Sequence, residues 1–385
     1  MNRRILYFLL ILFAFKVNAQ VITVNVNPSS QTKGLLMLSE LVEQIEYISL
    51  ETNDNCIVGH ITDFDISDNY IVVYVFQSKE IFLFSRNGRF ITMIGSQGQG
   101  PAEYLSPGWI SIDEKKKYVY VQDGQNLLIY DFTGKFVTSF SFEGRNKIIY
   151  AYHDNQFITG TLSVQSNEDY YVYGIWDSTM KLLKQDVKGV PVKNNGGYNA
   201  GAHVSPPISS YFYQEILHLK ESVLNDTIYL VNKNSDFVPK YIINCGRYGM
   251  TPEIKGDTDN FFENRKKYIG GMRFFETSNY LLLRYFYNGE QIPCYFDKKA
   301  NKLLYFNSGK GIPDDYAGGI DFWPSKQKNN LLFGFYNAPD LLDHYFQQKK
   351  ITPKGTSNAI HRVQSLINQL DAEDNPVLII ARIKQ

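Results

Sequence analysis

The sequence has little cysteine, few histidines and no excess of charge, and each shortage excludes a class of protein. Its three cysteines, Cys56, Cys245 and Cys294, lie far apart. A disulfide framework or a zinc site needs more cysteines at closer, paired spacing. The six histidines form no His-x-His or His-Glu-x-x-His pattern. We therefore expect three buried thiols, no bound cofactor and no metal site, although loops could still bring distant metal ligands together in a central channel.

Neither the net charge nor any sequence motif indicates a nucleic-acid-binding protein or a catalytic site. Lys and Arg number 39, as do Asp and Glu, so the formal net charge is zero. A nucleic-acid-binding protein normally carries a basic patch, so we expect no nucleic-acid partner. The Gly-x-Ser-x-Gly motif of serine hydrolases is absent. The motifs therefore predict no catalytic residue.

The N-terminus is the one long apolar segment. Basic residues stand at Arg3 and Arg4, an apolar run extends from Ile5 to Phe15, and small residues precede Gln20. This order is typical of a cleaved signal peptide, and the run is shorter than the about 20 residues of a spanning helix. We predict a signal peptide over residues 1–19, with no membrane span after cleavage. Because no cysteine follows the cut, we expect a periplasmic or extracellular protein without a lipid anchor.

A hairpin recurs along the chain. Ile81–Ile94 and Leu127–Phe140 share one order: four apolar residues, Ser or Asp, two residues, Gly, a basic residue, Phe and alternating apolar positions. Weaker copies follow, and the turn-entry residues of all five copies are Ser85, Asp131, Asp177, Asn232 and Asp297. A short polar side chain there can accept hydrogen bonds from the turn backbone.

Two further β-like runs precede each hairpin, which gives four strands per unit. Four-stranded units at a period of about 40–60 residues are typical of a β-propeller. A β-sandwich or a β-solenoid is the alternative, but a sandwich does not explain five copies of one hairpin. Aromatic residues, at 15 % of the chain, also favour an all-β core.

Five hairpins predict five blades, and the remaining strands predict a sixth. Its strands are expected in residues 318–325, 329–338 and 376–384. The fourth is expected at residues 20–27, whose apolar alternation predicts a strand that pairs with the last blade and closes the ring. The expected architecture is a six-bladed propeller of four-stranded blades in one domain, residues 20–385, closed by N- and C-terminal strands.

Helical periodicity is confined to two places. Residues 338–370 contain Pro339 near one helix start and a Thr-Ser-Asn cap before an apolar stripe at Ile360, Val363 and Ile367. We predict a helical insertion in the last blade. Residues 257–268 predict a shorter helix.

The glycine-rich stretch "MIGSQGQGPAEYLSP", Met93–Pro107, has two interpretations. A dinucleotide-binding loop needs a strand before it and a helix after it. Here a β-like run containing Pro107 follows, and "CGRYGMTPE" at Cys245–Glu253 repeats the order of glycines, proline and glutamate. We therefore interpret both stretches as corners between blades.

Several stretches resemble a known family. These are "LSELVEQIEYISLET", "IGSQGQGPAEY", "DGQNLLIYDFTGKFV" and "DNPVLIIARIK". Together they resemble the exported six-bladed β-propeller proteins of Bacteroidetes, which are relatives of NHL-repeat propellers. The resemblance covers nearly the whole mature chain and implies the fold, but this family is largely uncharacterised and implies little about function. Many members are lipid-anchored, and this chain lacks the required cysteine.

Candidate ligand-binding residues are aromatic or acidic and lie near the predicted corners. They are Tyr104, Trp109, Asp113, Tyr198, His203, Asp321 and Trp323. The rings could stack on a sugar or anchor a peptide, and the acids could form a ring at the channel mouth that suits a cation or a sugar. Packing between blades and capping of strand ends are the structural alternatives.

The favoured hypothesis is a monomeric exported binding or scaffold propeller, without chemistry of its own, that recognises a glycan, a peptide or an envelope partner. The alternative is a lyase or hydrolase of a glycan or lactone that uses channel-mouth acids and histidines. A third hypothesis is an assembly role in the envelope through the helical insertion.

Overall fold

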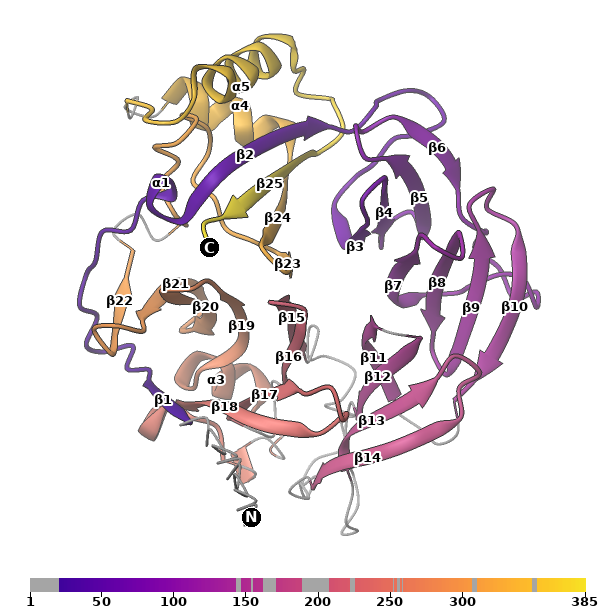
Figure 1. The fold of residues 1–385 in the computed structure, drawn as a ribbon, viewed down its shortest axis with the longest axis horizontal. Coiled ribbons are helices and arrows are strands. Elements are labelled where there is room, and N and C mark those ends of the chain that lie inside the picture. Colours follow the sequence, from indigo (N-terminus) through magenta and orange to yellow (C-terminus); the bar gives the residue numbers. More distant parts are fainter. Residues whose placement is uncertain are drawn as a thin grey trace, which may run out of the picture.

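Small sheets follow one another around a ring, as Figure 1 shows. The computed structural model describes residues 21–142, 147–153, 155–161, 171–188, 208–221, 226–251, 253–254, 257, 259–306, 310–347 and 352–385. These residues are mostly β, with few short helices. The fold is an all-β, propeller-like arrangement, as the recurring hairpins predict. The predicted signal peptide lies outside the described residues.

Four sheets each hold four antiparallel strands that are consecutive in the sequence. The first contains β3 (Ile61–Ile66), β4 (Tyr70–Val75), β5 (Glu80–Ser85) and β6 (Phe90–Met93). The second contains β7 (Pro107–Asp113), β8 (Tyr118–Asp123), β9 (Asn126–Asp131) and β10 (Phe136–Ser141). The third contains β11 (Lys147–His153), β12 (Gln156–Thr161), β13 (Tyr171–Asp177) and β14 (Leu182–Lys188). The fourth contains β19 (Gly270–Glu276), β20 (Tyr280–Tyr287), β21 (Glu290–Asp297) and β22 (Lys302–Tyr305).

The remaining strands form one nine-stranded sheet in the order β1-β18-β17-β16-β15-β23-β24-β25-β2. Its first five members are β1 (Ile22–Asn25), β18 (Phe237–Asn244), β17 (Thr227–Val231), β16 (Ile216–Glu221) and β15 (Ile208–Tyr213). The others are β23 (Lys326–Lys328), β24 (Leu331–Tyr336), β25 (Val377–Ile383) and β2 (Val42–Ser49). A single parallel residue pair, Phe212 with Lys328, joins β15 to β23. The described residues thus form four separate four-stranded sheets and one larger mixed sheet, not six separate sheets.

The ring closes where the two ends of the chain pair. Strand β25 runs antiparallel to β2, with Ile383 opposite Val42 and Val377 opposite Ser49. Pairing between N- and C-terminal strands is therefore confirmed. The predicted closing strand, residues 20–27, is wrong, because β2 takes that place.

Strand β1 instead covers the outer edge of another part of the nine-stranded sheet. It runs parallel to β18, with Ile22 opposite Tyr241 and Asn25 opposite Asn244. Its alternation places Val24 in the largest apolar cluster, where the side chain is fully buried. Alternating apolar residues identify a half-buried strand but not its partner, which explains the error.

The hairpin turns follow the predicted chemistry. The Oδ1 atom of Asp131 accepts hydrogen bonds from Thr133 N at 2.8 Å and Lys135 N at 3.1 Å. Asp177 and Asn232 cap their turns in the same way. Gly88 and Gly134 have φ of +87° and +83°, values that favour glycine. The corner interpretation of Met93–Pro107 also holds, because the stretch joins β6 to β7 and Gly100 N donates to its Glu103 side chain at 2.8 Å.

Residues 318–325 do not form the predicted strand. Gly318 has φ of +79°, and Pro324 has no N–H group for a sheet ladder. Strand β23 begins only at Lys326. Irregular backbone therefore precedes the inner strand.

The helices lie where periodicity predicts them. The insertion holds α4 (Ala338–Gln347) and α5 (Ser357–Gln369), and the Thr356 side chain caps α5 by accepting from Ala359 N at 3.2 Å. The shorter predicted helix is α3 (Phe261–Lys267). A single helical turn, α1 (Leu38–Leu41), and a 3-10 turn, η2 (Gly246–Tyr248), complete the helices of the described residues.

Polar side chains of one sheet accept hydrogen bonds from backbone N–H groups on the inner strand of a neighbouring sheet. Asp63 Oδ2 accepts from Ile110 N at 3.0 Å, and Gln122 Oε1 accepts from Ile149 N at 2.8 Å. The same arrangement pairs Ser209 with Phe274 and Gln327 with Glu276. Backbone N–H groups that face the next sheet are therefore satisfied, which fixes the spacing around the ring.

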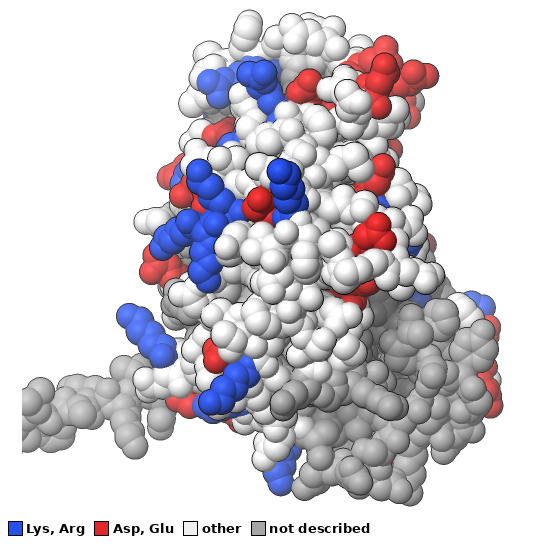
Figure 2. All heavy atoms as spheres, turned by 90° about the vertical axis from the view of Figure 1, so that its right-hand side faces the viewer, with Lys and Arg blue, Asp and Glu red and all other residues white. Residues whose placement is uncertain are grey.

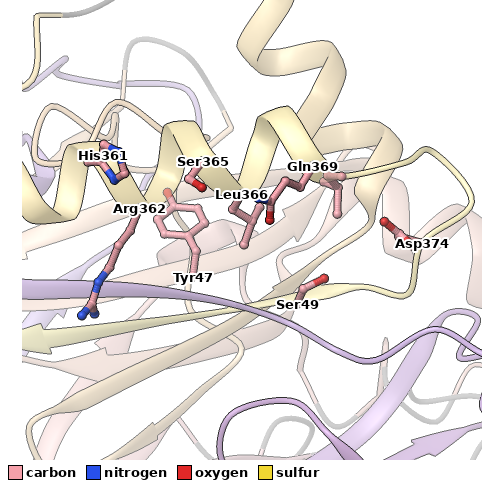
Figure 3. Close-up of a pocket in the computed structure, with 9 residues that line it drawn as sticks. Tyr47, Ser49, His361, Arg362, Ser365, Leu366, Gln369 and Asp374 are labelled. Atoms are coloured by element: carbon pink, nitrogen blue, oxygen red, sulfur yellow. The ribbon is translucent and has the colours of Figure 1, made fainter.

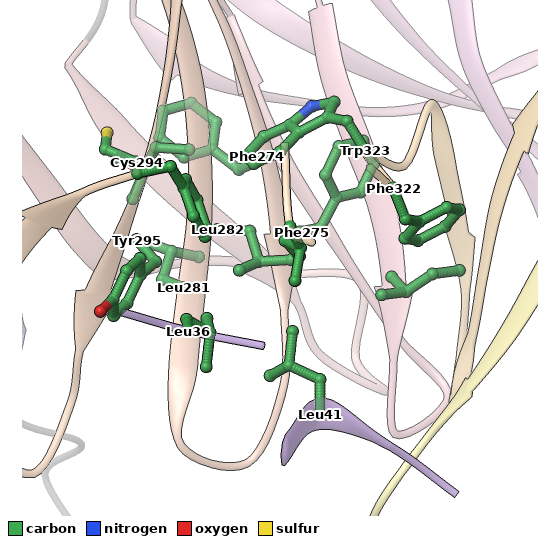
Figure 4. Close-up of a cluster of buried hydrophobic side chains, with 14 of the residues drawn as sticks. Leu36, Leu41, Phe274, Phe275, Leu281, Leu282, Cys294, Tyr295, Phe322 and Trp323 are labelled. Carbon is green, nitrogen blue, oxygen red and sulfur yellow. The ribbon is translucent and has the colours of Figure 1, made fainter. Parts of the chain in front are cut away.

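The largest apolar cluster includes residues from both sides of the junction between β22 and β23. Figure 4 shows Phe274 and Phe275 of β19 close to Phe322 and Trp323, with Leu36 and Leu41 beside them. Cys245 and Cys294 belong to this cluster, and Cys56 lies in another. All three cysteines are free and buried, as expected.

Charge is unevenly distributed although the chain is neutral. In Figure 2, which shows the right-hand side of Figure 1, Lys and Arg gather mostly toward one edge of the visible surface and Asp and Glu toward the other. On this face the left side carries both signs of charge, whereas the right side carries mostly Asp and Glu.

Candidate functional site

Two predicted ligand-binding residues belong to the core. Tyr104 is 1 % exposed, and its hydroxyl donates to the Ile94 carbonyl at 3.0 Å. Trp109 is 9 % exposed and packs edge-on against Phe157. Both side chains are therefore packed between other core residues, which is the structural alternative to a ligand-binding role. Tyr198 and His203 lie outside the described residues.

Asp113 caps the end of an inner strand. Its carboxylate accepts from Tyr152 Oη at 2.8 Å and from Lys116 N at 3.1 Å. It ends β7, whereas Asp321 precedes β23.

Asp321 and Trp323 do line a common cavity. We call it the Arg284 pocket, and it has a volume of about 490 Å³. It lies between β20, the segment before β23, the end of β24 and helix α4. Its lining residues are Arg284, Lys310, Ile320, Asp321, Trp323, Ser325, Phe335, Tyr336, Asp340, Asp343 and His344.

A tightly hydrogen-bonded loop holds one wall of the Arg284 pocket. Ile312 and Phe322 exchange backbone hydrogen bonds of 2.9 and 2.8 Å. Between them, the buried Asp314 carboxylate accepts from three backbone N–H groups of the loop and from Tyr47 Oη at 2.8 Å. The loop is anchored at its base and centre, so Asp321 and Trp323 are positioned by a well-ordered network.

The Tyr336 hydroxyl holds the backbone of Trp323 in place. The Tyr336 hydroxyl accepts from Trp323 N at 2.6 Å and lies 3.2 Å from the Trp323 carbonyl oxygen. Gly334 makes room, because an added Cβ would approach that carbonyl to 3.0 Å. This strand therefore needs glycine at position 334 and a hydroxyl at position 336.

Arg284 lies across the Trp323 ring. The centre of its guanidinium is 4.4 Å from the ring centroid. Its Nη2 donates to the Lys310 carbonyl at 2.6 Å, and Nη1 lies 3.5 Å from Gln291 Oε1. Burial lowers the pKa of Arg284 to about 10, so it stays a cation at neutral pH. Because Arg284 covers one face of the indole, Trp323 cannot offer that face to a sugar.

Two N–H groups of this pair have no acceptor. The buried Nε of Arg284 and the buried Nε1 of Trp323 make no hydrogen bond with any described residue. Arg284 also has no carboxylate partner among those residues. Buried donors are rarely left unpaired in a native protein. Because Arg284 and Trp323 both line the Arg284 pocket, the pocket is suited to a ligand that supplies acceptor oxygens.

Three carboxylates also line the cavity. Asp321 is 8 % exposed, whereas Asp340 and Asp343 are exposed at the start of α4. Burial lowers the pKa of His344, and the Asp321 charge acts against that shift. The residues that line the pocket therefore include both hydrogen-bond donors and carboxylate acceptors.

Arg284 and His344 were not among the predicted residues. A signal for Arg284 exists in "YLLLRYFY", where one charge interrupts an apolar strand. For His344 the only signal is its place in the predicted insertion. Its closeness to Asp321 depends on how the insertion folds back.

A second cavity lies between helix α5 and strand β2. This groove has a volume of about 470 Å³ and is lined by Tyr47, Ser49, His361, Arg362, Ser365, Leu366, Gln369, Leu370 and Asp374. Figure 3 shows Tyr47 of β2 below α5, with Arg362 extending from the helix toward the strand. The groove is a polar seam between the insertion and the ring.

A metal-binding cluster and a membrane-spanning helix are both absent from the described residues. These residues contain no group of three His, Cys, Asp or Glu side chains placed to hold a metal ion. None of their helices combines the length and the apolar character needed to cross a membrane.

Comparisons with known proteins give a family and a fold. Residues 20–382 match a family described as "Domain of unknown function (DUF4934)". The chain is similar in structure to a Bacteroides fragilis protein thought to be exported, with a TM-score of 0.66, 17 % identity, and coverage of 95 % of this chain and 100 % of that one. It also resembles a member of the DUF4221 family from Bacteroides vulgatus, with a TM-score of 0.49, 11 % identity, and coverage of 89 % and 97 %. No curated protein is similar enough in sequence to count as a match.

Proposed function

The chain belongs to the DUF4934 family, and we propose that it is an exported six-bladed β-propeller that binds an extracellular glycan in the Arg284 pocket. One observation carries the assignment of the site: a cavity of about 490 Å³ is lined by Arg284 and Trp323, and each of these residues has a buried N–H group without an acceptor among the described residues. Small-molecule sites are commonly concave, with a few convergent polar groups. Sugar hydroxyls can accept from hydrogen-bond donors and donate to the carboxylates that line the same pocket.

Six blades follow if the nine-stranded sheet is counted as two. Strands β15–β18 form one four-stranded set, and β23, β24, β25 and β2 form another. Among the described strands, the Phe212–Lys328 pair is the one strand pairing that joins the two sets, across the inner strands. Strand β1 is then a fifth strand on the outer edge of its blade. In this interpretation the sixth blade joins both chain ends.

Export is the second part of the proposal. Its supports are the signal-like N-terminus and the similarity to a Bacteroides protein thought to be exported. The mature protein would begin at Gln20 and act as a monomer in the periplasm or outside the cell. Mass spectrometry of the protein from its native host would measure that N-terminus. Retention of residues 1–19 would contradict the proposal.

Binding can be tested with a glycan array and the purified mature chain. Arg284→Gln and Trp323→Phe should reduce binding of the ligands that the wild type retains. Arg362→Gln is a matched control, because it removes an exposed arginine from the α5 groove. Loss of binding in the control but not in the two pocket variants would move the site to the groove. If the wild type binds only peptides, the glycan assignment fails while the pocket stands.

Catalysis is the alternative, and one observation favours testing it. Asp321 and His344 line the same pocket, so an acid and a base could face one ligand. Each retained glycan should therefore be incubated with the protein and checked for product. Turnover that Asp321→Asn abolishes would favour a glycan lyase or hydrolase over a binding protein.

A further inference from the structure

We propose that the Arg284 pocket recognises the carboxylate of an acidic sugar, a uronic acid residue within a glycan. This inference rests on the proposed function, and it names the chemical group by which the ligand is selected. Arg284 is the group that would bind the carboxylate, with Trp323 as a second donor.

The first argument is the state of the arginine. Arg284 is half-buried, and an arginine partly removed from water normally pairs with a carboxylate or phosphate, because desolvating its charge is costly. Arg284 has no such partner among the described residues, and its Nε and the neighbouring indole Nε1 lack acceptors. A carboxylate has two oxygens that could accept from these two N–H groups. Hydrogen bonds between ionised partners are roughly twice as strong as neutral ones.

The second argument is the position of the indole. Arg284 covers the Trp323 ring at 4.4 Å, and the Phe306 ring packs edge-on at 6.2 Å between centroids. Trp323 is 6 % exposed, so it is poorly placed to stack on a sugar. Figure 4 shows its nitrogen at the edge of the apolar cluster, away from Leu36 and Leu41. Its contribution to a ligand is therefore a hydrogen-bond donor.

The third argument concerns the rest of the ligand. Asp321, Asp340 and Asp343 line the same cavity and would repel a ligand with several negative charges. They can accept hydrogen bonds from hydroxyl groups. One carboxylate together with several hydroxyls fits this arrangement, and a uronic acid residue has both. A sulfated or phosphorylated ligand, or a strongly acidic peptide, fits it less well.

Isothermal titration of the mature chain should compare oligosaccharides of galacturonic or glucuronic acid with their methyl esters and with neutral sugars of the same linkage. We expect one uronide series to bind, and its methyl ester to bind about tenfold or more weakly. Arg284→Gln should weaken uronide binding by about the same factor and leave ester binding unchanged. Arg362→Gln should behave as wild type, and melting curves should establish that every variant is folded.

The outcomes separate the inference from the proposed function. Equal affinity for uronide, ester and neutral sugar, reduced in Trp323→Phe, would reject the carboxylate and keep the glycan site. Uronide binding that Arg284→Gln leaves intact would reject Arg284 as its partner. Binding of free amino acids or acidic peptides in place of every uronide, or no uronide binding at all, would also overturn the inference.

Discussion

Lys298 Nζ lies 2.7 Å from Oε1 of Glu276, a carboxylate that is only 1 % exposed. Lys240 approaches the other oxygen at 3.0 Å, and Tyr241 Oη donates to Oε1 at 2.8 Å. Gln327 bonds the Glu276 backbone in both directions at 2.7 Å. This network joins β18, β19 and β23 and the turn after β21. Because it connects sheets far apart in sequence, it should contribute strongly to the stability of the ring.

Replacing Glu276 with Gln should destabilise the protein by about 3 kcal/mol, the scale for removing one partner of a buried ion pair. The change leaves two lysines close together without their shared carboxylate. Urea unfolding measures the loss. Glu263→Gln is the control, because Glu263 is part of an exposed pair with Lys266 at 2.8 Å and should cost less than about 1 kcal/mol. Equal losses in the two variants would refute a special role for the Glu276 network.

Stability should also fall with acidity in two stages. Burial and the Lys240 charge lower the pKa of His218 from 6.5 to about 4, so its contribution is complete above about pH 6.5 and is lost toward pH 4. Burial alone would raise the pKa of Glu276, but Lys298 and Lys240 lower it from 4.5 to about 2, so its contribution is lost toward pH 2. Melting temperatures should therefore decline from pH 6.5 downward.

The first stage can be assigned by substitution. His218→Gln should flatten the decline between pH 6.5 and 4, whereas His361→Gln, on the exposed surface of α5, should leave the wild-type slope. An unchanged slope in His218→Gln would mean that other groups control this range.

Local chemistry explains how much of the fold was predictable. The hairpins were found because residues such as Asp131 must cap their own turns, a requirement met within a few residues of sequence. The pairing of N- and C-terminal strands is predictable in general, but the identity of the closing strand is not, because β1 and β2 both have apolar faces and pairing depends on distant partners. Strand β1 has the stricter alternation of apolar and polar residues, but it pairs with β18. The closing strand β2 has charged residues between its apolar ones.

The candidate site shows the same limit. Trp323 and Asp321 were selected for residue type and position near a corner, and they do share a cavity. Tyr104 satisfied the same criteria and is buried, because its ring fills the space beside Tyr130. Arg284 comes from a different sheet, so only the packed structure places it over Trp323.

The closing seam should depend on its buried residues. Ile45 of β2 is 4 % exposed and lies opposite Ala381 of β25. Ile45→Ala should cost about 2–5 kcal/mol, the range for removing a large aliphatic side chain from a core. Ile91→Ala is a matched control on another strand, where the side chain is 42 % exposed, and should change stability by less than about 0.5 kcal/mol. Similar denaturation midpoints for the two variants would mean that β2 contributes little to closing the ring.

The hydroxyl of Tyr336 should be essential for holding Trp323 in place. Tyr336→Phe removes the acceptor of the Trp323 backbone N–H, a 2.6 Å hydrogen bond, and should cost about 1–3 kcal/mol because that donor is left unpaired. Hydrogen exchange gives a local readout: the Trp323 amide should exchange faster in the variant, while amides in the sheet of β7–β10 keep their wild-type rates. Tyr70→Phe is the control, because no described residue bonds its hydroxyl, and it should change stability by less than about 0.5 kcal/mol. Unaltered exchange at Trp323 in Tyr336→Phe would show that the loop from Ile312 to Phe322 holds this wall of the pocket without the hydroxyl.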